Sequence, residues 1–338
     1  MSTANSSSQI GYVQVETTYG EIPNSTGTAT VANADAFRLI NLVTKGDTNQ
    51  VARPSKTTTL SRTAGILSKK AGNWSTRVEL AGSGAAGTAP DIDPFIRAAM
   101  GQAGTVVAST SVTYALEDAS PSLSVWNFRD PATMEQLVAL GAIVASLRVN
   151  VTQESSEIEF SGPCRYVTPS EGFSGLDATA KGGLSAFPAR PSSPTYAGVM
   201  ALGLYGSATI DGSAYTTLRS LSISADFARS LIDNVLFNGA YAGQPQQGIR
   251  NVTVDFELTD EDTVAIESLK AKARAKTAMD LVFVIGSTAG NICTITLNDV
   301  QLTSPDYDDA QPSWGAKFSG TAHASSETAK DELVIAFT

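Results

Sequence analysis

The chain has 338 residues, 42% of them hydrophobic, and a formal net charge of −10. That length suits two domains of ordinary size, each with a buried core. The acidic balance excludes a protein that grips nucleic acid, because such proteins neutralise phosphates with Lys and Arg.

Two cysteines, Cys164 and Cys293, are too few for a disulfide framework or a cysteine metal site, and we expect buried free thiols. No apolar run reaches the roughly 18 residues of a membrane span. The opening MSTANSSSQI lacks the basic start and apolar centre of a signal peptide. We therefore expect a chain without a membrane anchor that stays in the cytoplasm where it is made.

The first part of the chain is polar. Residues 1–30 are rich in Ser, Thr and Gly, which predicts a mobile N-terminal arm with TYGEIP, residues 18–23, as an anchor. A strand is predicted over 37–43. The long polar segment that follows, residues 45–72, has one acid, Asp47, and six bases: Lys45, Arg53, Lys56, Arg62, Lys69 and Lys70. A solvated loop explains this charge, but the length favours an arm that docks on an acidic neighbour.

A strand, a glycine loop and a helix follow in order. Residues 74–80 alternate between apolar and polar side chains, and Asp93-Pro94 begins a helix that ends at Gly101. The intervening GSGAAG matches a dinucleotide-binding fingerprint. The match fails in context, because Thr88-Ala89-Pro90 separates the glycines from the helix and no acid follows about 20 residues on.

The rest of this half reads mainly as strands, over 105–116, 143–151 and 157–160. The segment 122–141 is compatible with either a helix or a strand, since residues that could begin and end a helix and an alternating strand pattern are both present. A Pro-rich linker is predicted over 176–197.

The second half repeats this plan. Strands are predicted over 215–223, 251–258, 281–285, 293–302 and 332–337, and a less basic arm over 225–250. Thr259–Asp262 has the form of a capping box, and Val264, Ile266, Leu269 and Ala273 form the apolar stripe of the helix that it would begin.

Two fixed offsets relate the halves. At 178 residues, Ile40 lies over Leu218 and Glu79 over Glu257, and at 158 residues the FSG of 160–162 lies over the FSG of 318–320. A diverged tandem duplication explains both. It predicts a first domain over 31–175 and a second over 198–338.

Several phrases carry a resemblance to a known family: TYGEIP, VELAGSGAAGTAPDIDPFIRAAMG, TSVTYAL, EFSG, KFSG and DELVIAFT. The chain resembles the major tail tube proteins of long-tailed, siphovirus-type bacteriophages, of the kind with two tube domains. The resemblance implies a mainly β fold of two tandem tube-type β-sandwich domains, each with one flanking α-helix and a long projecting arm. It also implies a hairpin rather than a helix over 122–141.

The same resemblance implies self-association. Three chains would close a ring of six domains, and the rings would stack into a virion tail tube, with tape-measure and tail-terminator proteins as further partners. DNA would pass through the lumen without specific binding. The residues predicted to reach an adjacent ring are Arg53, Lys56, Arg62, Lys69 and Lys70.

An acidic lumen would keep DNA from adhering. Candidates on the non-core face of alternating strands are Glu79, Glu157, Glu159, Asp255 and Glu257, for which ordinary solvent exposure is an equal explanation. The alternative function is a cytoplasmic binding module or enzyme. We find no catalytic motif, metal spacing or cofactor site to support it, and the single histidine, His323, is expected on an exposed strand. A surface adhesin is disfavoured by the missing secretion signal.

Overall fold

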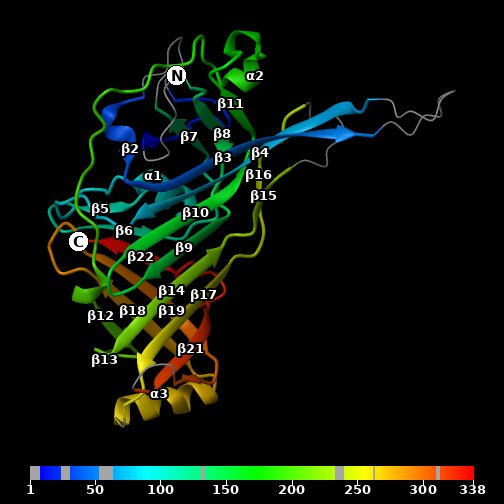
Figure 1. Cartoon of the computed structure of the whole chain (residues 1–338). Coiled ribbons are helices and arrows are strands. Elements are labelled where there is room, and N and C mark those ends of the chain that lie inside the picture. The colour runs from blue at the N-terminus through cyan, green and yellow to red at the C-terminus, as the bar shows by residue number, and fades with distance from the viewer. Residues whose placement is uncertain are drawn as a thin grey trace.

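The computed structural model describes residues 8–23, 31–52, 64–130, 134–232, 240–261, 263–309 and 313–338. The chain forms an elongated, mainly β molecule in which the N-terminal half and the helix α3 lie at opposite ends (Figure 1). Three α-helices are described: α1 (Asp93–Met100), α2 (Ala178–Lys181) and α3 (Val264–Arg274). Short 3-10 turns cover Asn33–Asp35, Phe173–Gly175 and Gly203–Tyr205.

One long sheet runs through both halves of the chain. Its main path, in spatial order, is β13 (Ser213–Tyr215), β12 (Ser207–Ile210), β18 (Ala278–Ile285), β19 (Cys293–Leu302), β21 (Gly315–Ala322), β17 (Asn251–Thr259), β14 (Leu218–Asp226), β9 (Ser146–Val151), β10 (Ser156–Cys164), β4 (Ile66–Glu79) and β3 (Leu39–Val51). Three branches leave this path: β20 (Asp306–Asp308) pairs with β21, β22 (Val334–Phe337) pairs with β19 and with β6 (Ser111–Ala115), and β5 (Thr105–Val107) pairs with β6.

A second sheet covers the first half. It has the order β11 (Tyr166–Pro169), β8 (Leu137–Ala142), β7 (Leu123–Phe128), β1 (Ile10–Val15) and β2 (Ala36–Phe37). A separate ribbon pairs β15 (Arg229–Leu231) with β16 (Pro245–Gln247). The β7–β8 pairing confirms the hairpin predicted over 122–141, of which residues 131–133 lie outside the described residues.

Period-two alternation produces the core, as the sequence predicts. On β17, Val252, Val254, Phe256 and Leu258 are buried, while the residues between them face outward.

The helix α1 contributes to the same apolar core. Its Phe95 ring stacks on Trp74 and Phe160, at centroid distances of 5.6 and 5.2 Å, and meets Phe37 edge-on at 4.9 Å. Cys164 and Cys293 are free and buried, which confirms the prediction for both thiols.

The two helix predictions differ in outcome. The first is confirmed: α1 ends at Met100, and Gly101 follows in the left-handed conformation with φ 87°, which glycine adopts without strain. The second is wrong at its start. Strand β17 extends to Thr259, and Thr263 caps α3 by accepting a hydrogen bond from Ile266 N at 3.3 Å. Val264, expected in the apolar stripe, is 88% exposed because it lies in the first turn beyond the core.

Two segments expected to lack regular structure are strands. Residues 8–23, assigned from the sequence to a mobile arm over 1–30, include β1, which pairs with β7 from Ile10↔Phe128 to Val15↔Leu123. The described parts of the basic segment, residues 45–52 and 64–72, belong to a hairpin of β3 and β4 that pairs as far as Val51↔Ile66 and projects beyond the body (Figure 1). Residues 1–7, 24–30 and 53–63 lie outside the described residues.

The strand order of the first half recurs in the second. β3, β4, β10 and β9 are neighbours in that order, as are β14, β17, β21 and β20. Cross-strand pairs relate the two sets: Phe160 faces Thr76, and Phe318 faces Phe256. By this register the residue of the first half that corresponds to Phe256 is Thr76, whereas the 178-residue offset would make it Val78. The 178-residue offset is therefore displaced by two residues once the two FSG strands are aligned.

The TYGEIP segment is anchored by the buried carboxylate of Glu16. Gly20 N and Ser122 Oγ donate to one oxygen at 2.7 Å each, and Gly141 N and Ser124 Oγ donate to the other at 2.8 Å each. Burial nevertheless raises the pKa of Glu16 to about 7, although these hydrogen bonds lower it. The folded chain therefore holds this proton more tightly than the unfolded chain, whose value is near 4.5.

We expect the free energy of unfolding to fall as pH rises from about 4.5 to 7, because the folded state binds more protons than the unfolded state in this window. The shift corresponds to about 3 kcal/mol. Glu16→Gln should flatten the dependence, whereas Glu21→Gln, on the exposed part of the same loop, should keep it. Melting temperatures at pH 5 and pH 8 test this. An unchanged slope in Glu16→Gln would assign the dependence to another group.

Candidate functional site

The outer face of the long sheet is a continuous polar surface. It extends over eight adjacent strands, in the order β3, β4, β10, β9, β14, β17, β21 and β20. Side chains that alternate with the buried core residues point outward along these strands. Many are small hydroxyls or amides: Ser75, Asn150, Ser161, Ser220, Ser222, Ser224, Thr253 and Ser319. We call this surface the polar face.

Three of the five predicted acids come together on the first half of the polar face. Glu79 lies opposite Glu157 across β4 and β10, and Glu159 is flanked in register by Arg77 and Arg148. Arg77 also forms an ion pair with Glu157 at 3.4 Å. Bases therefore lie between these acids and reduce their mutual repulsion.

The other two acids lie together on β17 in the second half. Asp255 is opposite Ser222 and Ser319, and Glu257 is opposite Lys317. Glu257 also pairs with Arg219 at 3.0 Å. The polar face thus carries two acidic groups, one per half, separated by β9 and β14. The interleaved bases Arg77, Arg148 and Lys317 were not among the lumen-facing residues predicted from the sequence, although each has the same strand alternation as the acids.

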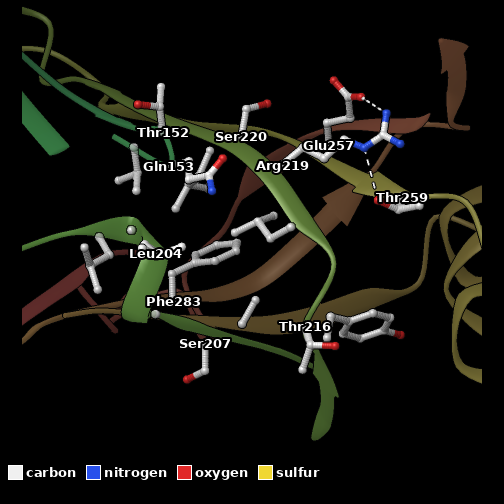
Figure 2. Close-up of a pocket in the computed structure, with 18 of the residues that line it drawn as sticks. Thr152, Gln153, Leu204, Ser207, Thr216, Arg219, Ser220, Glu257, Thr259 and Phe283 are labelled. Carbon is white, nitrogen blue, oxygen red and sulfur yellow. Dashed lines mark hydrogen bonds and ion pairs between the residues drawn. The ribbon is translucent and has the colours of Figure 1, made fainter. Parts of the chain in front are cut away.

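A cleft of about 790 Å³ opens beside β14 (Figure 2). Arg219 crosses its rim: Nε donates to Thr259 Oγ1 at 3.1 Å, and Nη2 donates to Ser313 Oγ at 2.7 Å. Phe283 and Leu204 line the apolar part. Among the described residues, no cluster of His, Cys, Asp and Glu is arranged to hold a metal ion. Arg219 fastens the turn at residues 313–314 to the strands behind it.

The projecting hairpin of β3 and β4 is braced at its base by the second half. Lys70 N donates to Ala240 O at 2.7 Å, and Ala242 N donates to Lys70 O at 3.2 Å. The Lys70 Nζ lies 5.1 Å from the ring centroid of Tyr241 and 5.5 Å from that of Tyr166. The Tyr241 hydroxyl donates to Asp177, and burial together with this bond raises the pKa of Tyr241.

The five predicted arm residues are therefore not equivalent. Lys70 is held within its own chain, a role that the sequence did not predict. Lys69 is half-buried, and its Nζ has no hydrogen-bond partner among the residues that the structure describes. Arg53, Lys56 and Arg62 lie outside the described residues. His323 is exposed, as expected, but it lies just beyond the end of β21 and not on a strand.

Removing the aromatic brace should loosen the hairpin without unfolding the body. We expect Tyr241→Ala to accelerate hydrogen exchange at the amides of Lys70 and Ala242, because both backbone bonds depend on the same contact. Tyr205→Ala, at a 60% exposed tyrosine, is the control. Equal exchange in both variants would show that the backbone bonds suffice alone. Exchange measured by mass spectrometry separates these results.

Comparisons with known proteins give a family match and similar solved structures. A family model described as phage tail tube protein matches residues 5–322. Among solved structures, a chain in the tail of an empty GTA particle, refined with C6 symmetry, is similar with 13% identity and a TM-score of 0.26; the match covers 37% of this chain and 85% of that one. No curated protein matches. No described helix is long and apolar enough to cross a membrane.

Proposed function

The chain belongs to the family of phage tail tube proteins, and from that premise we propose that its copies assemble into stacked rings that enclose the path of the DNA. It is a structural component of the virion tail. The finer proposal is a ring of three chains, in which each chain contributes two tube domains. The boundary between them is proposed within the linker of residues 176–197.

The observation that carries this proposal is the repeated strand order. Each half contributes four neighbouring strands in the same spatial order, and β9 of the first half pairs with β14 of the second. A chain with two similar units next to each other covers two adjacent positions of a closed ring. Three such chains supply six similar positions.

The polar face is the proposed lumen wall. DNA binding depends on basic side chains that neutralise phosphates. The many small hydroxyl and amide side chains of the polar face are uncharged and do not provide this neutralisation. Glu79, Glu157, Glu159, Asp255 and Glu257 are the acids proposed to face the lumen. The bases between them lower the field at the wall, so repulsion of DNA would be moderate rather than strong.

The ends of the tube and its interior would meet other proteins. We propose a tape-measure protein in the lumen and a tail-terminator protein at one end as partners, because a polymer of identical rings has no internal limit on its length. Membership of a structural family supports a non-enzymatic role. No feature of the cleft beside β14 favours a second function.

Imaging of assembled protein tests the ring. Symmetry-averaged electron microscopy should give rings of three chains, with pseudo-sixfold repetition of the tube domain. Six chains per ring, each placed with one half outside the wall, would overturn the proposal of three.

The predicted arm residues Arg53, Lys56 and Arg62, which lie outside the described residues, provide a second test. We expect Arg53→Ser, Lys56→Ser and Arg62→Ser together to shorten tubes and to leave the melting temperature of the subunit unchanged. Each exposed pair contributes about 0–1 kcal/mol and is screened by salt, so high salt should reproduce part of the effect. Arg274→Ser with Lys276→Ser, at exposed positions at the end of α3 and just beyond it, is the control. Normal tube length and salt tolerance in the triple variant would make the arm a solvated hairpin only.

A further inference from the structure

We propose that the edge of β20 in one chain pairs with the edge of β3 in the next chain, so that the joint between chains copies the joint between the two halves of one chain. This inference rests on the proposed ring. It identifies the strands that meet and their register.

The template is the antiparallel ladder of β9 and β14. It joins the halves through the pairs Arg148↔Ser224, Val149↔Ile223 and Asn150↔Ser222. Strand β9 reaches this ladder as the outer strand of a hairpin with β10. A second hairpin of the same kind should therefore present an equivalent edge.

The hairpin of β20 and β21 is that second copy. Asn150↔Glu157 in the first hairpin corresponds to Asp308↔Gly315 in the second, and Arg148↔Glu159 corresponds to Asp306↔Lys317. All these positions differ by the same 158 residues as the two FSG phrases. Because the paired positions are equally far apart in sequence in both hairpins, β20 is the counterpart of β9.

Strand β3 is likewise the counterpart of β14. Leu42 of β3 pairs with Thr76, which faces Phe160, and Leu221 of β14 pairs with Phe256, which faces Phe318. Lys45 lies three residues after Leu42, and Ser224 lies three residues after Leu221, so Lys45 corresponds to Ser224. The template register then sets Asp306 opposite Lys45, Tyr307 opposite Thr44 and Asp308 opposite Val43.

Both edges have the properties of an interface. Within the described residues, β3 pairs only with β4, and β20 pairs only with β21. Each exposes an apolar side chain, Val43 at 48% and Tyr307 at 50%. Exposed edges of this kind favour pairing with another chain. The register also sets the acid Asp306 against the base Lys45, which suits two different edges meeting head to tail.

The two edges of one chain cannot meet each other. Strands β20 and β3 stand at opposite ends of the eight-strand polar face. Seven spacings of about 4.8 Å separate them by roughly 34 Å along the sheet. A disulfide, which needs Cα atoms within about 7 Å, can therefore form between these edges only in an assembly.

The first experiment introduces Lys45→Cys and Asp306→Cys into the full chain. Tubes of this variant are oxidised and separated on a non-reducing denaturing gel. We expect covalent dimers and closed trimers, with little background because both native thiols are buried. Asn41→Cys with Asp306→Cys is the matched control: Asn41 is exposed on the same strand, about 13 Å away along it. Equal cross-linking in both pairs, or intact tubes without cross-links in the first pair, would overturn the register.

The second experiment uses charge and does not need new thiols. Lys45→Glu and Asp306→Lys should each reduce ring formation several-fold, and the double variant should restore it. Melting temperatures of the subunits should stay at the wild-type value, since both side chains are exposed. Failure of the double variant to recover contradicts the pairing. A wild-type chain that forms neither rings nor tubes would instead reject the proposed function.

Discussion

The ladder between β9 and β14 is the constraint on which the rest of the structure depends. It joins two similar halves edge to edge, and Leu147 and Val149 on one side continue into Ile223 and Ala225 on the other within one core. Arg229 strengthens the joint from behind. Its guanidinium donates to the carbonyl oxygens of Ala98, Val144 and Ala119, and burial lowers its pKa to about 10, so it remains charged at neutral pH. The halves are therefore held in one orientation.

That fixed orientation gives the molecule two distinct surfaces. Residues facing one side of the sheet enter the core with α1 and the second sheet. Residues facing the other side form the polar face across both halves without a break. Because strand side chains alternate with a period of two, a shift of one residue in β9 would exchange these surfaces. The apolar core thus sets which polar residues can share a wall.

Local patterns predicted much of this arrangement. The alternation around Phe256 and Ile158 predicted both strands and the outward direction of the acids, and Asp93-Pro94 with Gly101 predicted α1. The hairpin of β3 and β4 was missed because the segment 45–72 has few apolar residues, and the hairpin is stabilised by strand pairing and by Tyr241, which is distant in sequence. Strand β1 was missed for a similar reason, since β7 supplies its pairing. Contacts of this kind are non-local, and a single sequence gives no direct signal for them.

The fusion of two halves in one chain also has a mechanical consequence. In a ring of three chains, every second boundary between halves would be the β9–β14 ladder within one chain, backed by a covalent linker. Because both halves belong to one folded subunit, forming this boundary costs no association entropy when the ring assembles. Closing a ring of three chains costs the translational and rotational freedom of two association steps, whereas a ring of six separate domains would cost five. A ring of this design would have three strong joints and three weaker seams. Under strain, the wall would open at the seams and release whole chains, never single domains.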